Sequence, residues 1–332
     1  MVWIIFVVIV CAIAIGLIYL AMLDGSYTVR RTRLFPQDAE LLFDKIRDFK
    51  SWPDWSPWLL HEPETRLQYS DDCDQEGGFY TWDGERVGAG KLTHVEFDRP
   101  RRIRQRIEFT RPFKAVCEVT FEFTEQAGQT EVAWSMVGTM PFLFRFMTQK
   151  TVAMINQDYD LGLARLAGQL DKGCEHPEIN FAGEVEHGDQ HCLAQPFEGG
   201  PEAMKEVMTE GYPKLVEYVQ ENGDMAGPPM TLYHQVDLKK PYFICDMAVP
   251  TGPDTKPGRY QQREVDGGRY FKATLQGSYE FLGLAWYSVM SDVKMRKLKV
   301  DSRRPMLEVY ENDPREHSNT NEWLTSIYVP LK

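Results

Sequence analysis

The chain has 332 residues, enough for two domains of ordinary size, and 43% of them are hydrophobic, which supplies packed cores and argues against intrinsic disorder. Its 49 acidic and 37 basic side chains give a net charge of −12. This charge repels a nucleic-acid backbone, and no long basic stretch compensates for it, so nucleic acid is not an expected partner.

The first predicted element is a membrane anchor over residues 2–23, "VWIIFVVIVCAIAIGLIYLAML", which contains no charged side chain. As a helix it spans about 33 Å, which exceeds the ~30 Å hydrocarbon core of a bilayer. The basic start and small-residue cleavage site of a signal peptide are not visible, so the sequence predicts an uncleaved, single-pass anchor. Arg30, Arg31 and Arg33 follow the span, and the positive-inside rule therefore places the soluble domains in the cytoplasm.

Residues 25–172 predict a first domain with one strand, a short helix, several antiparallel strands and a long C-terminal helix. Pro36 suits the first turn of the short helix. The stretches "GGFYTWDG", "GAGKLTHVEF", "RIRQRIEFTR", "AVCEVTFEFTE" and "TEVAWSMVGTM" indicate strands separated by turn residues. The final stretch "TVAMINQDYDLGLARLAGQL" has apolar residues at helical spacing. We expect a curved sheet that grips the long helix.

The stretches "FPQDAELLFDKIRDFKSWPDWSPW", "VGAGK", "FTRPFKAVCEVTFEFTE" and "GQTEVAWSMVG" resemble an SRPBCC domain, the START-like or polyketide-cyclase-like family. The resemblance covers nearly all of residues 25–172. It implies a helix-grip fold with a hydrophobic cavity between the sheet and the long helix. The ligands of this family vary too widely to name one, and lipid or hydrophobe binding and transfer is one reading of such a cavity.

After an expected linker at 173–180, residues 181–332 contain an internal repeat at offsets of 76 to 80 residues. "CLAQPFEGG" aligns with "YFKATLQGS". The first "PM" pair aligns with the second, and the end of "AVP" aligns with the end of "YVP". Each half is predicted to run strand, helix, strand, strand, with helices near 201–222 and 278–294. Two such βαββ halves would build one antiparallel sheet with both helices on one face, and we expect the opposite face to form a concave cleft. The fold class is therefore α+β.

This repeat, with "VDGGRYFKATLQGSY", "LEVYENDP" and "TSIYVPLK", resembles the GyrI-like domain, also called the AraC-type effector-binding domain. The resemblance implies a cleft between the repeats that binds small molecules, often cationic and aromatic amphiphiles. Some family members are multidrug sensors and others hydrolyse electrophilic toxins. Sensors in the family usually carry a DNA-binding helix-turn-helix, and we find none in this sequence.

Glu308 lies within "RRPMLEVYENDP", where strand alternation puts Glu308 and Tyr310 on one face. The resemblance implies that Glu308 faces the cleft, with Trp286, Tyr287 and Tyr270 as aromatic walls. A buried carboxylate is costly unless it is paired, so it would select a cation or a hydrogen-bond donor. The alternative is that Glu308 lies on a solvated sheet face.

The sequence predicts a membrane-anchored protein that binds a small apolar or cationic amphiphile for sensing, sequestration or detoxification. Whether it is an enzyme stays open: Glu308 would be the catalytic residue of a hydrolase, with His234 and Glu311 as weak candidates for helpers. No cofactor or metal is expected, because His187 and His191 have helical spacing but Gly188 argues against a helix there. Oligomeric state and any protein partner are left open.

Overall fold

The computed structural model describes residues 2–237 and 240–332, and it divides into two compact units, one ending at Cys174 and the other beginning at Glu175. The first strand of the second unit begins at Glu178. The last three residues of the expected linker 173–180 therefore belong to that strand.

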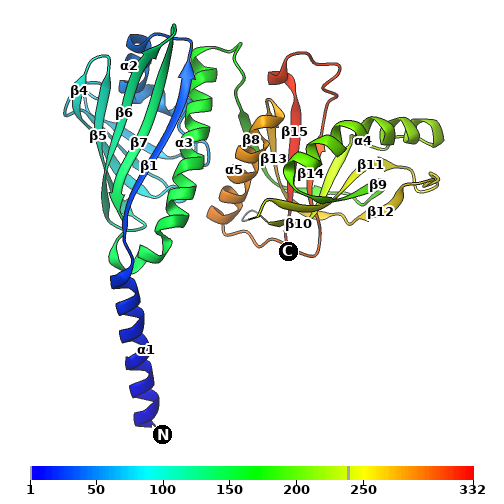
Figure 1. Ribbon diagram of the computed structural model, residues 1–332, viewed down its shortest axis with the longest axis horizontal. Coiled ribbons are helices and arrows are strands. Elements are labelled where there is room, and N and C mark those ends of the chain that lie inside the picture. Colours follow the sequence, from blue (N-terminus) through cyan, green and yellow to red (C-terminus); the bar gives the residue numbers. More distant parts are fainter. Residues whose placement is uncertain (1, 238–239) are drawn as a thin grey trace. The chain divides into compact units, whose positions relative to one another are not determined.

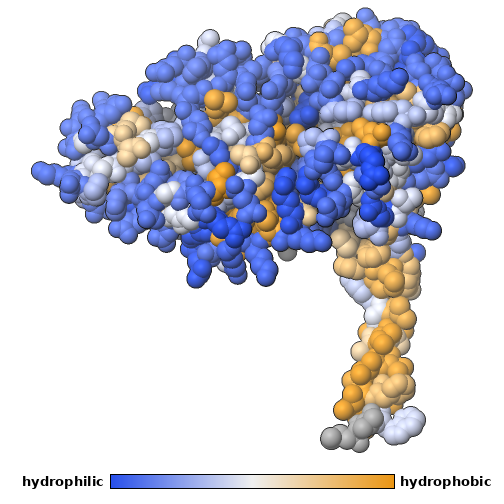
Figure 2. All heavy atoms as spheres, turned by 180° about the vertical axis from the view of Figure 1, so that it is seen from behind, coloured by the Kyte–Doolittle hydropathy of each residue, from blue (hydrophilic) through white to orange (hydrophobic). Residues whose placement is uncertain are grey.

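The N-terminal helix α1 (Val2–Met22) contains a stretch, Trp3–Met22, that is long and apolar enough to cross a membrane. Its apolar side chains are largely exposed in the isolated chain. Figure 2 shows this helix as a projecting column of hydrophobic residues, coloured orange. A helix that is apolar on all sides has no polar face to present to water.

The first unit is built on one antiparallel sheet with the strand order β1-β7-β6-β5-β4-β3-β2. Neighbours in this order are mostly consecutive in the chain, and β1 closes the series against the last strand, β7 (Figure 1). The strands are β1 (Ser26–Phe35), β2 (Arg66–Tyr69), β3 (Phe79–Asp83), β4 (Ala89–Asp98), β5 (Arg102–Arg111), β6 (Ala115–Gln126) and β7 (Gln129–Thr139).

A long helix, α3 (Thr148–Leu170), packs along β1 and covers the sheet, as the helix-grip architecture requires (Figure 1). The core between them is aromatic: the rings of Trp134 and Tyr159 stack 3.8 Å apart, centroid to centroid, and both side chains are buried. Shorter helices complete the unit, namely α2 (Ala39–Arg47), η1 (Phe49–Asp54) and η2 (Phe142–Met147).

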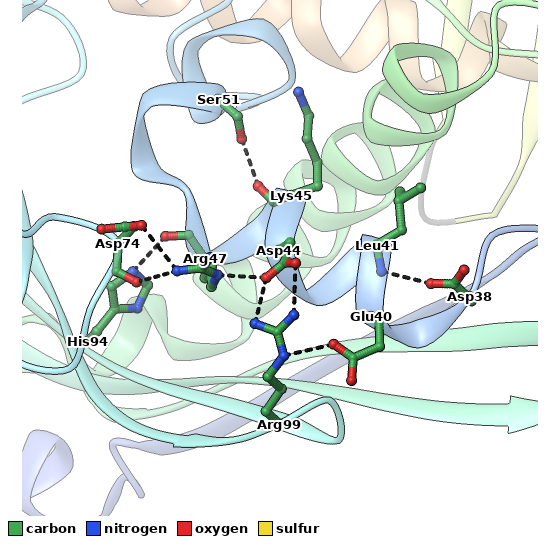
Figure 3. Close-up of polar contacts among 10 residues, drawn as sticks. All are labelled: Asp38, Glu40, Leu41, Asp44, Lys45, Arg47, Ser51, Asp74, His94 and Arg99. Atoms are coloured by element: carbon green, nitrogen blue, oxygen red, sulfur yellow. Dashed lines mark hydrogen bonds and ion pairs between the residues drawn. The ribbon is translucent and has the colours of Figure 1, made fainter.

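Polar contacts fix α2 against the turn between β4 and β5 (Figure 3). Asp38 caps the helix by accepting a hydrogen bond from the backbone N–H of Leu41 at 2.8 Å. Arg99 pairs with Glu40 at 2.7 Å and with Asp44 at 2.9 Å. These pairs are half exposed, so each contributes about 1 kcal/mol or less, and the buried apolar face of α2 supplies most of its stability.

The second unit contains an eight-stranded antiparallel sheet with the order β12-β9-β11-β10-β14-β15-β13-β8. Its helices are α4 (Pro201–Asn222), α5 (Leu282–Met295), η3 (Tyr279–Phe281) and η4 (Thr320–Glu322). Its strands are β8 (Glu178–His187), β9 (Gln190–Gly199), β10 (Met230–Asp237), β11 (Tyr242–Thr251), β12 (Gln261–Val265), β13 (Gly268–Gln276), β14 (Met306–Tyr310) and β15 (Leu324–Pro330).

Each half of the repeat contains the expected strand, helix, strand, strand and one further strand, β8 in the first half and β12 in the second. These added strands are exchanged, because β8 pairs with β13 of the second half and β12 pairs with β9 of the first. The halves also meet at the centre of the sheet, where β10 pairs with β14.

The exchange curls the sheet back on itself. Only two residues join β8 to β9, and two join β12 to β13, although each connection links opposite edges of the sheet. Two residues span less than about 10 Å, so the edges must approach each other there. Gly267 ties the two connections together by donating its N–H to the Asp189 carboxylate at 2.7 Å.

The face enclosed by this curl is a hydrophobic core rather than the open concave cleft that the sequence suggested. The expectation of a cleft opposite the helices is therefore wrong, because the exchanged edge strands close that side. The buried residues of this core are Cys192, Ala194, Met230, Leu232, Ala248, Val265, Tyr270, Leu307 and Val309.

Candidate ligand-binding sites

Glu308 is a buried carboxylate, 2% exposed, in the middle of β14. It accepts a hydrogen bond from the indole Nε1 of Trp286 at 2.5 Å and one from the Tyr310 hydroxyl at 2.8 Å. The Tyr233 hydroxyl donates a longer bond of 3.5 Å. Trp286 lies on α5, so the carboxylate sits between the sheet and the helices and not on the enclosed face.

The two halves contribute to this site in a pseudosymmetric way. Thr231 of β10 pairs with Glu308 of β14 across the centre of the sheet. Tyr233 and Tyr310 are the residues two positions further along these strands, so each half presents one phenol to the carboxylate. The hydroxyl of Tyr212, from α4, lies 2.9 Å from that of Thr231 and extends the network to the second helix.

Burial and hydrogen bonding act in opposite directions on the Glu308 carboxyl group. Burial raises the pKa of the Glu308 carboxyl above its ordinary value, while the hydrogen bonds from Trp286, Tyr310 and Tyr233 act in the opposite direction. These three partners are neutral donors. Burial and the nearby Glu308 charge raise the pKa values of Tyr233 and Tyr310, so both stay protonated and continue to donate. A cation would compensate the carboxylate better than neutral donors do.

The first unit contains a cavity of about 260 Å³ between the sheet and α3. Two of its buried lining groups, the Trp134 indole N–H and the Tyr159 hydroxyl, have no hydrogen-bond partner within the described part of the chain. Most of the lining is apolar or aromatic, including Trp52, Trp58, Tyr80, Trp82, Ile107, Phe109, Phe113, Met136, Met140 and Ile155, and Ser56, Arg111, Thr139 and Thr151 add polar groups.

Each of the two domains matches a known family. Residues 26–171 match the family described as polyketide cyclase / dehydrase and lipid transport, and residues 195–332 match the GyrI-like small molecule binding domain. The chain is a fusion of these two domain types. Both resemblances seen in the sequence are thereby confirmed, and both domains belong to small-molecule-binding families. No curated protein matches the chain.

Solved structures match parts of the chain. Protein MLL2253 from Mesorhizobium loti is 13% identical, with a TM-score of 0.36, and the match covers 45% of this chain and 99% of that one. SAV2435, solved bound to tetraphenylphosphonium, is 11% identical with a TM-score of 0.37, covering 46% and 93%. The EcmrR C-terminal domain is 14% identical with a TM-score of 0.38, covering 48% and 98%. These likenesses concern the fold alone.

Of the predicted site residues in the GyrI-like domain, Tyr310 and Trp286 contact Glu308 directly. Tyr287 follows Trp286 on α5, and adjacent helical residues do not share a face. Tyr270 is not part of the site. It is buried in the enclosed core on the other side of the sheet, where its hydroxyl donates to the Asp266 carbonyl at 3.1 Å.

Sequence reasoning missed Tyr233, Thr231 and Tyr212. A repeat offset of 77 residues, between the 76 and 78 of the matching segments, would have aligned Tyr233 with Tyr310 and Thr231 with Glu308. Tyr212 reaches the site from a helix. Its contact with Thr231 depends on tertiary packing, so no local sequence pattern could have identified it.

The suggested helpers lie elsewhere. His234 bonds the buried Asp246 carboxylate at 2.9 Å, and Arg263 bonds the same carboxylate at 2.7 Å. Burial alone would raise the pKa of Asp246, but these two hydrogen bonds lower it overall. Glu311 pairs with Lys272 at 3.6 Å. Neither His234 nor Glu311 has a hydrogen bond to Glu308 among these contacts.

The histidines of the second unit that sequence reasoning weighed as metal ligands have separate partners. His187 contacts the Gly188 carbonyl at 2.7 Å, and His191 lies 3.9 Å from Glu264. Across residues 2–237 and 240–332 no group of three or more His, Cys, Asp or Glu side chains has an arrangement that would hold a metal ion.

Proposed function

We propose that this protein is a membrane-anchored small-molecule-binding protein whose GyrI-like domain takes a cationic, apolar ligand at Glu308. The observation that supports this is a carboxylate 2% exposed, whose hydrogen-bond partners Trp286, Tyr310 and Tyr233 are all neutral. A buried carboxylate of this kind lowers the stability of the fold. A cationic ligand would gain more binding free energy from it than a neutral or anionic ligand.

Trp286 is the group that a ligand would displace. Its side chain is partly exposed, and it covers the carboxylate from the α5 side. When Trp286 swings away, the ligand replaces its hydrogen bond to Glu308 with a charge contact. Tyr233 and Tyr310 then present aromatic rings at the same point, and each cation–π contact in a dry site is worth about 1–2 kcal/mol.

The test uses two probes of nearly the same shape and opposite charge, tetraphenylphosphonium and tetraphenylborate, with the full chain in detergent. We expect the cation to raise the unfolding temperature of the GyrI-like domain and the anion to leave it unchanged. In Glu308→Gln the cation should bind at least about tenfold more weakly, which corresponds to 1.4 kcal/mol. Glu311→Gln removes the same charge outside the site and should bind as the parent does. Equal binding of both probes, or an unaffected Glu308→Gln protein, would refute the proposal.

A hydrolase is the second candidate for the same site, favoured by the raised pKa of Glu308. A carboxylate with a raised pKa is a stronger base toward the proton of an attacking water. The discriminating result is turnover of an electrophilic substrate, for example a cyclopropane-bearing compound, that Glu308→Gln still binds but no longer converts. If the parent protein does not convert the compound and Glu308→Gln no longer binds it, the site recognises a ligand without catalysing a reaction.

The first domain has its own candidate function, the binding of an apolar molecule in the cavity beneath α3. The unpartnered donors on Trp134 and Tyr159 favour a ligand with one oxygen acceptor in an otherwise apolar body. We expect 1-decanol to stabilise this domain and Tyr159→Phe to reduce the stabilisation severalfold. Tyr69→Phe, outside the cavity lining, is the matched control. Stabilisation that does not depend on the Tyr159 hydroxyl would mean that the cavity recognises only apolar shape.

A further inference from the structure

The short helix η2 (Phe142–Met147) exposes more apolar surface than a water-facing segment normally does. Phe142, Leu143, Phe144 and Phe146 have 37% to 61% of their surface accessible. The Phe113 ring, from the turn between β5 and β6, stacks on Phe144 at 5.2 Å. We call these five residues the aromatic base. A contiguous exposed apolar patch of this kind marks a surface that contacts a partner.

The aromatic base is joined directly to the end of α1. Arg145, within η2, donates a hydrogen bond to the Leu23 carbonyl at 3.2 Å, and the Met140 N–H donates to the Gly25 carbonyl at 2.8 Å. The apolar span ends at Met22. The patch therefore lies at the level where α1 would leave the hydrocarbon core of a bilayer. In Figure 2 the orange of α1 passes into pale orange where the helix meets the domain.

The residues beside the patch suit a lipid headgroup layer. Lys114 follows Phe113, and Lys150 follows η2 at the start of α3, and both side chains are exposed. Aromatic side chains with lysines at their margin are typical of segments that lie in the membrane interface, where the rings enter the acyl boundary and the ammonium groups meet anionic lipids.

We propose that the aromatic base docks into the lipid bilayer beside α1 and that the cavity of the first domain opens toward it. The cavity lining includes Phe113, which belongs to the aromatic base, and Met140, which lies two residues before η2, so the cavity reaches the docking surface. An apolar molecule entering there passes from the bilayer into the cavity without crossing water. This inference rests on the proposal that α1 spans a membrane and is independent of Glu308.

The experiment measures the environment of single nitroxide labels in the full chain, reconstituted in phosphatidylcholine vesicles with 20% phosphatidylserine (about one anionic lipid in five). One protein is labelled at the native Cys11 in α1. Two others carry Leu143→Cys or Leu41→Cys in a Cys11→Ala background. All three proteins also carry Cys174→Ala, because Cys174 is partly exposed whereas Cys73, Cys117, Cys192 and Cys245 are buried. Leu143 is 60% exposed in the patch, whereas Leu41 is 46% exposed on α2, which Figure 1 places at the end of the domain away from α1. Collisions with oxygen report the bilayer, and collisions with a nickel chelate report water.

We expect the labels at Cys11 and position 143 to collide preferentially with oxygen, and the label at position 41 to collide preferentially with nickel. The ratio of oxygen collisions to nickel collisions should be severalfold higher at position 143 than at position 41. If Cys11 reports the bilayer and position 143 reports water, anchoring stands and docking is overturned. If Cys11 also reports water, the anchor itself fails, and docking fails with it. The label at 143 replaces an exposed side chain, so folding is not at risk.

Discussion

Two buried glutamates show how the partners of a side chain decide its role. Glu62 is 4% exposed and accepts hydrogen bonds from the backbone N–H groups of Glu85, Arg86 and Val87, between 2.7 and 2.9 Å. Burial alone would raise the pKa of Glu62, but these bonds lower it. Glu308 has a comparably small exposed surface, yet its pKa is raised because desolvation outweighs its three hydrogen bonds. Glu62 therefore stabilises the turn between β3 and β4, whereas Glu308 keeps the ligand-binding role that we propose for it.

The two residues should respond in opposite ways to the same substitution at pH 7. Glu62→Gln removes the charge that three N–H groups bind, and we expect a loss of about 1–3 kcal/mol in the unfolding free energy of the first domain. Glu308→Gln removes a buried charge without a cationic partner, so the second domain should be unchanged or more stable. Hydrogen exchange, measured as a function of urea concentration, reports the unfolding of each domain separately. Destabilisation by Glu308→Gln comparable to that of Glu62→Gln would mean that Glu308 is also structural.

His94 gives the first domain a pH dependence. The ring is 1% exposed, stacks on Phe49 and contacts the Arg47 carbonyl at 2.9 Å (Figure 3). Burial lowers its pKa from 6.5 to about 4. The unfolded state thus binds a proton at a pH where the folded state does not. The stability from neutral His94 is present above pH 6.5 and is lost as the pH falls toward 4, by about 3 kcal/mol in total.

The prediction is that His94→Gln flattens the stability of the first domain between pH 7 and pH 4. Unfolding followed by hydrogen exchange in peptides from β4 and β5 measures this domain alone. His191→Gln, on the other unit, should leave the slope unchanged. An equally steep loss in His94→Gln would assign the acid sensitivity to other groups.

At the scale of elements, the exchange of β8 and β12 makes the two halves of the GyrI-like domain depend on each other. A first half alone, residues 175–252, would leave β8 and β10 without their partners β13 and β14. Its share of the enclosed core, including Met230 and Leu232, would then face water. Unpaired edges and exposed apolar residues oppose folding.

We therefore expect residues 175–252 to be unfolded alone and to fold when mixed with residues 253–332. Circular dichroism and amide proton dispersion measure both states. A first fragment with native dispersion by itself would show that each half is an independent domain.

Some elements were predictable from local pattern and others were not. The helix expected near 201–222 is α4, Pro201–Asn222, with proline at its start. The helix expected at 278–294 is α5, Leu282–Met295, preceded by the 3-10 turn Tyr279–Phe281. The strands β8 and β12 were missed because each is an edge strand with a largely exposed pattern. Their partners lie in the other half of the repeat, so only tertiary pairing defines them.

At the scale of the whole molecule, a membrane anchor at α1 would decide on which side of the membrane the two domains meet their ligands. Arg30 pairs with Glu122 at 3.3 Å, and Arg31 pairs with Asp160 at 2.6 Å. The positive-inside rule counts the arginines themselves and not the net charge, so we still expect both domains on the cytoplasmic side.

Protease protection tests this orientation. Trypsin added to inverted membrane vesicles should digest the soluble domains, whereas intact spheroplasts should protect them. Digestion from the outside of intact cells would reverse the predicted orientation and would make the ligands extracytoplasmic.

The sequence by itself determined the apolar helix, both domain types and the internal repeat, because each depends on local pattern or on motifs of consecutive residues. It also singled out Glu308 as a candidate site residue, which stays a prediction. Only the tertiary structure decided which face Glu308 occupies. Alternation places Glu308 with Tyr310 but cannot tell which side of a sheet the helices cover. It also cannot show that two-residue connections close the other side and bury Tyr270 there. The site is therefore formed by Trp286, Tyr233 and Tyr310, from three separate elements that fold together around one carboxylate.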